Sequence, residues 1–296
     1  MNRRSHSRSF AMRLLACCYL VAFLVAAVAY RFLPIGMTVL AKTFIADIVA
    51  TIVVFCFSRW VDNSSLYDPY WSVAPPVLYA VWLRNVGIAS FLIFAMVAAM
   101  LFWSVRLTVN CISHWGGLQD EDWRYVSFRE KLGAAYWPVS FLGIHLFPTL
   151  IVFACSLPMW SFMALSRSSM RSAFALVGIV FVLFGTVLEL VADRQMSRFQ
   201  RERASQTECC ISGLWGLCRH PNYLGELSVW WGVCIASFAN SDTPLWFVVF
   251  PCAMTAMFFG YSIPAMEKRQ LTRRPCYRQV RRSVPMLFPR LRGRKR

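Results

Sequence analysis

The sequence contains a series of long apolar runs separated by short polar or charged segments. The runs cover residues 14–29, 44–57, 77–83, 86–105, 136–160, 173–191, 222–239 and 245–263. Runs near 20 residues match the length of a helix that crosses the hydrocarbon core of a bilayer. We therefore predict an all-α, polytopic transmembrane helix bundle with seven to eight spans.

Composition supports this interpretation and argues against a water-soluble protein. Hydrophobic residues make up 58% of the 296 residues and charged residues only 15%. A soluble globular domain is about a quarter charged. The apolar excess is gathered in long runs, which a soluble core would not require.

The formal net charge of +17 comes from basic residues in three places. They lie before residue 14, between Arg194 and Arg203, and after Lys268. Each group flanks an apolar run, as the positive-inside rule and attraction to anionic lipid headgroups predict. We therefore expect all three segments on the cytosolic face, membrane lipids as partners and no nucleic acid. Two cytosolic ends require an even number of spans, which favours eight.

The expected organisation is an N-terminal transmembrane hairpin at 1–60, followed by a membrane domain with a basic tail at 61–296. The first run is interpreted as an uncleaved helix, because no clear small-residue cleavage site follows it. Three prolines at 64–76 argue against a regular helix there. The polar segment 106–135 is expected to be a water-exposed loop. The protein is expected in the endoplasmic reticulum membrane of a eukaryote, or the inner membrane of a bacterium.

The eleven cysteines indicate neither a metal site nor a disulfide framework. Several lie inside apolar runs, where cysteine behaves as a small hydrophobic residue. The only close pairs are adjacent residues, Cys17-Cys18 and Cys209-Cys210, and no CxxC spacing occurs. We therefore predict no metal and no disulfide framework.

Two polar segments adjoin apolar runs, where ionisable groups are costly and usually functional. In the first, Glu189 and Asp193 are four residues apart, so they share one face of a helix. The second, residues 213–226, ends directly in an apolar run. Pro221 suits the first turn of a helix, so Arg219 and His220 would lie at a helix start that favours phosphate. Its polar members are Arg219, His220, Asn222, Tyr223 and Glu226.

The motif Arg-His-Pro-Asn-Tyr-Leu-Gly-Glu at 219–226 closely resembles a membrane family of unknown function, DUF1295. That family belongs with the C-terminal domain of the steroid 5α-reductases (3-oxo-5α-steroid 4-dehydrogenases). The preceding Gly-Leu-Trp and the later Trp-Trp-Gly also match. So do Tyr-Asp-Pro-Tyr-Trp at 67–71, Ala-Asp-Arg-Gln at 192–195, and residues 264–269 with Tyr277. The resemblance covers roughly residues 60–290.

The resemblance implies a cytosol-facing NADPH pocket. Asn222 and Glu226 would face the nicotinamide, while Arg219, His220 and Tyr223 would bind ribose or phosphates. Asp193 would hold a hydroxyl group or orient an arginine. The implied cofactor-binding residues are Arg106, Asp193, Arg198, Arg219, His220, Asn222, Tyr223, Glu267 and Tyr277. The arginines of 194–219 and 269–282 are expected to select NADPH over NADH.

These residues favour a membrane-embedded NADPH-dependent reductase of a C=C bond in a hydrophobic small-molecule, lipid or steroid-like substrate. The candidate catalytic residues are Glu226, Asp68 and Tyr70, the last two as acids. The sequence departs from the family in two places. Trp103 replaces a tyrosine that polarises the substrate carbonyl in steroid reductases, and Met196 stands where relatives carry a lysine.

Two other functions fit part of the pattern. Isoprenylcysteine carboxyl methyltransferases have a similar Arg-His-Pro-x-Tyr motif and bind S-adenosylmethionine there. Asn222 and Glu226 together favour the reductase over this alternative. A non-enzymatic lipid-binding scaffold would bind neither cofactor.

Overall fold

The computed structural model describes residues 7–87, 90–164 and 171–289, and these residues form helices without any strand. The chain divides into two compact units. The first unit consists of Met1–Ala89 and Ser104–Met163, and the second of Ser90–Trp103 and Ala164–Arg296. Helix α4 (Phe91–His114) therefore contributes its first half to the second unit and its second half to the first.

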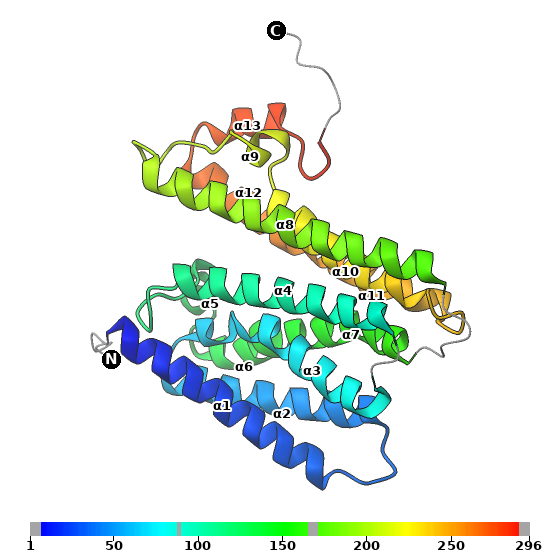
Figure 1. The fold of residues 1–296 in the computed structure, drawn as a ribbon. Helices are drawn as coiled ribbons and strands as arrows, with labels where there is room; N and C mark the ends of the chain where they lie inside the picture. Colours follow the sequence, from blue (N-terminus) through cyan, green and yellow to red (C-terminus); the bar gives the residue numbers. More distant parts are fainter. Residues whose placement is uncertain (1–6, 88–89, 165–170, 290–296) are drawn as a thin grey trace. The chain divides into compact units, whose positions relative to one another are not determined.

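The rest of the first unit is built from the helices before and after α4 (Figure 1). They are α1 (Arg8–Phe32), α2 (Val39–Trp60), η1 (Ser64–Tyr67), α3 (Tyr70–Val86), α5 (Trp123–Leu132), η2 (Gly133–Ala135), α6 (Tyr136–Ser140), η3 (Phe141–Leu146) and α7 (Phe147–Met163). Helices α1 and α2 pack through small buried residues, among them Ala22 and Ala50.

The second unit is all-helical after α4, and its longest helix is α8 (Ser172–Glu202). Its elements after α4 are α8 (Ser172–Glu202), α9 (Leu214–Leu217), α10 (Pro221–Ser237), η4 (Leu245–Val248), α11 (Val249–Met257), η5 (Phe258–Ser262), α12 (Ile263–Arg273) and α13 (Tyr277–Ser283). Helices α9, α12 and α13 lie at the C-terminal end of α8 (Figure 1).

Six helical segments of the described chain are long and apolar enough to cross a membrane. They are Arg8–Phe32, Val39–Trp60, Phe91–His114, Trp123–Met163, Ser172–Glu202 and Leu245–Arg273. By helix length and hydropathy the protein is therefore a multi-pass integral membrane protein. The predicted count of seven to eight is not reached because α3 and α10 have only 17 residues each. A spanning helix needs about 20 residues.

Two predicted loops are in fact largely helical. Helix α4 continues to His114, and α5 begins at Trp123, so only residues 115–122 of the expected 106–135 loop separate them. The Asp122 side chain starts α5 by accepting a hydrogen bond from the Arg124 backbone N–H at 2.8 Å. Polar composition does not prevent a helix when the first turn is capped in this way.

Helix α3 runs through Pro75 and Pro76, which the sequence analysis expected to break it. Pro76 has no N–H, so it leaves the carbonyl of Ser72 without its helical donor. The hydroxyl of Ser104 on α4 donates to that carbonyl at 2.6 Å. A neighbouring helix thus replaces the lost hydrogen bond, as membrane proteins often arrange around proline.

We expect Ser104→Ala to lower the free energy of unfolding by about 1 kcal/mol, because Ser104 is buried and its loss leaves the Ser72 carbonyl unsatisfied. Reversible unfolding in mixed micelles measures the change. The control is Ser113→Ala, since that hydroxyl bonds its own helix at an exposed end. Equal stability of the two variants would contradict this role for Ser104.

Helices α8 and α10 run side by side and touch through four glycines (Figure 1). A Cβ atom added to Gly178 would lie 2.5 Å from the carbonyl oxygen of Gly232, and one added to Gly225 would lie 2.7 Å from that of Gly185. Both distances are shorter than any van der Waals contact. The two backbones therefore approach as closely as they do only because these positions lack side chains.

Candidate functional site

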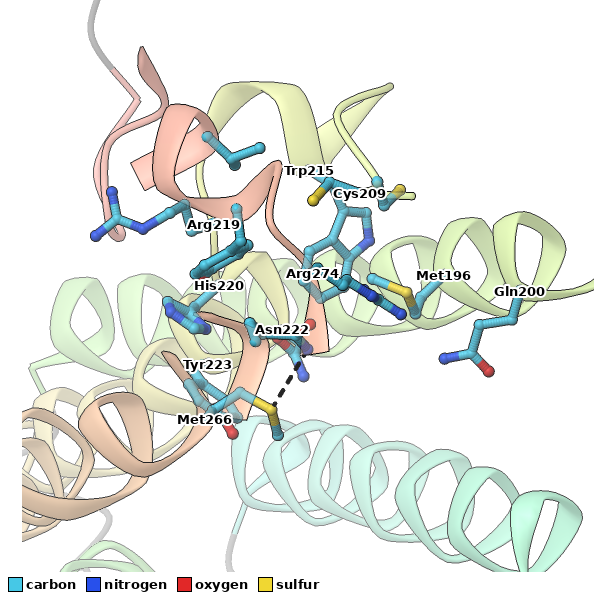
Figure 2. A pocket seen from close by; sticks show the side chains of 14 residues that line it. Met196, Gln200, Cys209, Trp215, Arg219, His220, Asn222, Tyr223, Met266 and Arg274 are labelled. Carbon is cyan, nitrogen blue, oxygen red and sulfur yellow. Dashed lines mark hydrogen bonds between the residues drawn. The ribbon is translucent and has the colours of Figure 1, made fainter. Parts of the chain in front are cut away.

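A cavity of about 230 Å³ lies within the second unit, where α8, α10 and α12 end or begin. Its walls come from the last turns of α8, the loop after α8, the first turn of α10, and the α12–α13 region (Figure 2). Four residues of the 219–226 motif line it, namely Arg219, His220, Asn222 and Tyr223. Tyr277 also lines it, so five of the predicted cofactor-binding residues share one cavity.

The cavity combines hydrogen-bonding groups with flat aromatic surfaces. His220 stacks on Tyr223, with ring centres 5.2 Å apart and planes 4° from parallel. Trp215 is held in the wall because its indole N–H donates to the Ala192 carbonyl at 2.9 Å. Gln195 supports the same turn by accepting from the Leu214 N–H at 2.9 Å. The Ala-Asp-Arg-Gln run thus anchors the segment that carries Trp215.

Arg219 and His220 are positioned by one buried carboxylate. Oε1 of Glu267 accepts from Nε of Arg219 at 2.8 Å and lies 3.3 Å from Nε2 of His220. Its other oxygen lies 3.2 Å from Nε of Arg281. Arg219 also donates to the backbone carbonyls of Arg281 and Val284. Glu267 is not part of the cavity wall, but its contacts orient Arg219 and His220, which are.

Arg274 is the second arginine of the cavity and has a different environment. Within the described part of the chain, no carboxylate forms an ion pair with it. Burial lowers the pKa of Arg274, and the nearby charges of Arg203 and Arg273 lower it further. Crowded cations beside a cavity are stabilised by a bound anion.

Glu226 does not line the cavity. It is buried on α10, where Oε2 accepts from the Trp103 indole at 3.0 Å and Oε1 from the Trp230 indole at 2.7 Å. The predicted placement of Glu226 beside the cofactor therefore receives no support from the cavity. Trp103, which departs from the steroid reductases, is a hydrogen-bond donor to this carboxylate.

The remaining predicted cofactor residues lie elsewhere. Arg198 is exposed and pairs with Glu202 one turn later, at 2.9 Å. Asp193 is half-buried on α8 and is not a wall residue, whereas Met196 and Gln200 of the same helix are. Arg106 is buried on the half of α4 that belongs to the first unit.

The two predicted acids, Asp68 and Tyr70, belong to the first unit. Asp68 accepts a hydrogen bond from Oη of Tyr125 at 2.6 Å, and burial raises the pKa of Asp68 to about 7. Tyr70 is buried and donates to Oδ1 of Asp47 at 2.7 Å. Sequence reasoning did not identify Asp47 as the partner of Tyr70.

The sequence analysis predicted no disulfide framework, but it did not foresee the one disulfide of the described chain, in which Cys209 and Cys276 are bonded across 67 residues. Both lie in segments without apolar runs, so the argument from cysteines inside membrane helices did not apply to them. Only the fold brings the two segments together.

Some of the other wall residues could be recognised from the sequence. Trp215 lies in the Gly-Leu-Trp motif and Arg274 lies in the arginine-rich tail. Gln200 and Gln270 lie outside every motif that we recognised in the sequence.

Comparison with known proteins gives the family. A family model described as "Protein of unknown function (DUF1295)" matches residues 54–284, well over half of the chain. The chain belongs to the DUF1295 family. It is also similar to "Uncharacterized protein C594.04c" of Schizosaccharomyces pombe, with 26% identity over 259 residues that cover 80% of this chain and 75% of the relative. No solved structure matches the chain.

Proposed function

We propose that this DUF1295 protein is a membrane-embedded, NADPH-dependent reductase of a C=C bond in a lipid or steroid-like substrate. The observation that carries the proposal is Arg274, a cation without a carboxylate partner in the described chain, in a cavity that the first turn of α10 also lines. The N-terminus of a helix is itself favourable for phosphate.

The residues of the wall fit a dinucleotide in their chemistry. Arg274 offers a planar set of donors that matches a phosphate group bidentately. Trp215 and Tyr223 provide aromatic surfaces on which a base or ring can stack, and Asn222 and Gln270 provide amide groups for hydrogen bonds. Glu267 keeps Arg219 and His220 in fixed orientations, so little ordering is needed when a ligand binds.

In this proposal bound NADPH supplies a hydride, and the protein supplies binding, orientation and a proton. Reduction of a C=C bond conjugated to a carbonyl also needs a group that stabilises the developing negative charge on oxygen.

The charge of the cavity favours NADPH over S-adenosylmethionine. S-adenosylmethionine carries a positive sulfonium and no phosphate, so the group formed by Arg203, Arg273 and Arg274 would repel it. The 2′-phosphate of NADPH brings close to two negative charges to the same place. The reductase therefore fits the structure better than the methyltransferase of the isoprenylcysteine type.

We expect the detergent-solubilised protein to bind NADPH at least tenfold more tightly than NADH, because one added charge-assisted hydrogen bond contributes about 1.5 to 3 kcal/mol. Parallel titrations with NADPH, NADH and S-adenosylmethionine measure this. Equal affinity for the two nicotinamide nucleotides would contradict phosphate selection. Tight S-adenosylmethionine binding would instead support the methyltransferase, and no binding of any of the three would support a scaffold.

A further inference from the structure

Three cysteines meet beside the cavity. Cys209 (Figure 2) and Cys210 line it from the loop after α8. Cys209 is disulfide-bonded to Cys276, which directly precedes α13. Cys210 is a buried free thiol, while Cys276 is exposed. The bond is therefore open to solvent from one side and adjoins the cavity on the other.

The disulfide joins a segment without regular structure to a helical one. Residues 203–212 form neither helix nor strand, yet they supply two wall residues. Cys209 packs against the small apolar cluster of Tyr277, Val280 and Val284 on and beside α13. Tyr277 and Val280 also line the cavity. The disulfide thus holds one wall of the cavity against another.

The charge pattern indicates on which side of the membrane the disulfide lies. The loop directly follows the basic segment 194–203, and Cys276 lies in the basic tail, so both are expected on the cytosolic face. Disulfides in a reducing cytosol are rare, and those that occur are usually transient, catalytic or redox-sensing. Arg274, two residues from Cys276, adds positive charge that stabilises a thiolate during exchange.

We propose that Cys209–Cys276 is a reversible redox latch on the cavity wall, opened by a cellular dithiol. A thiolate of the dithiol attacks Sγ of Cys276, an exposed residue, and Cys209 leaves as a thiolate. The second thiol of the reductant then displaces Cys276, so the reductant becomes a cyclic disulfide. Two electrons and two protons pass to the protein, which then holds two thiols.

The oxidised state keeps the loop in place and the cavity preformed, whereas reduction releases the loop. A ligand must then order the loop as it binds, which weakens affinity. This consequence rests on the proposed function, because it takes the nucleotide as the ligand. A second consequence does not depend on any ligand: Cys210 becomes accessible when the loop is released.

The experiment compares the solubilised protein before and after dithiothreitol, with the disulfide state confirmed by mass spectrometry. We expect reduction to weaken NADPH binding by about tenfold, as loss of preorganisation would, and to speed maleimide labelling of Cys210. Cys276→Ser should behave as the reduced protein without reductant. Cys252→Ser, at an exposed free cysteine on α11, should keep the wild-type response to dithiothreitol.

The outcomes separate the two proposals. Unchanged NADPH affinity and unchanged Cys210 labelling after complete reduction would overturn the latch while leaving the proposed function intact. Faster Cys210 labelling with no NADPH binding in either state would support the latch and overturn the proposed cofactor. Free Cys209 and Cys276 in protein prepared without reductant would also overturn the latch. The comparison of the wild-type protein before and after reduction remains a valid test even if Cys276→Ser does not fold.

Discussion

Replacing Gly178 with leucine is expected to remove most of the folded protein from the membrane fraction. A Cβ at this position would lie 2.5 Å from the Gly232 carbonyl oxygen and 2.6 Å from the Cβ of Ala236. Neither obstacle is the end of a flexible side chain, so α8 and α10 would have to separate. Overpacking a well-packed core costs about 1 to 3 kcal/mol, and more where backbones collide. Since α10 carries Asn222 and Tyr223, the cavity would be lost as well.

The matched control is the same substitution at Gly260, where an added Cβ meets nothing within 4 Å. Size-exclusion chromatography and thermal denaturation in detergent should show Gly260→Leu behaving as wild type and Gly178→Leu aggregating or melting earlier. Equal melting of the two variants would show that close approach of α8 and α10 does not hold the second unit together.

Arg274→Ala is expected to weaken NADPH binding by roughly ten- to a hundredfold, through the loss of one charge-assisted hydrogen bond of about 1.5 to 3 kcal/mol. The affinity for NADH should change less, so the preference between the two nucleotides should shrink. The fold should survive, because Arg274 forms no ion pair within the described residues. Arg274→Lys should recover only part of the affinity, since an ammonium group lacks the planar donor set.

The control for Arg274→Ala is Arg198→Ala, which removes one positive charge from the same basic region. Arg198 is exposed and paired with Glu202, outside the cavity. Its removal should leave NADPH affinity within about twofold of wild type, since exposed ion pairs contribute about 0 to 1 kcal/mol. Equal losses in both variants would indicate a general electrostatic effect rather than a site at Arg274.

The local parts of the site could be predicted from the sequence. The 219–226 motif lies around the start of one helix, α10. The position of Pro221 in the first turn and the grouping of Arg219 to Tyr223 around that turn therefore follow from local sequence rules for helix starts. Membrane spans of 22 or more residues were also found by hydropathy. Helices α3 and α10 have 17 residues each and are shorter than the six candidate spans, because apolar character alone does not reveal where a helix ends.

The features that were missed depend on partners far away in the chain. Glu226 was expected in the pocket, but the Trp103 indole, 123 residues away, binds its carboxylate. Pro76 was expected to break a helix, but Ser104 replaces the missing hydrogen bond. Cys276 finds Cys209 only after the second unit folds. No local pattern encodes these pairings.

An experimental structure of the detergent-solubilised protein with saturating NADPH tests the proposed function. We expect nucleotide density in the cavity of the second unit, with a phosphate group against Arg274 and an aromatic ring of the ligand against Trp215 or Tyr223. A cavity that stays empty under these conditions, or NADPH bound at a different place, would contradict it.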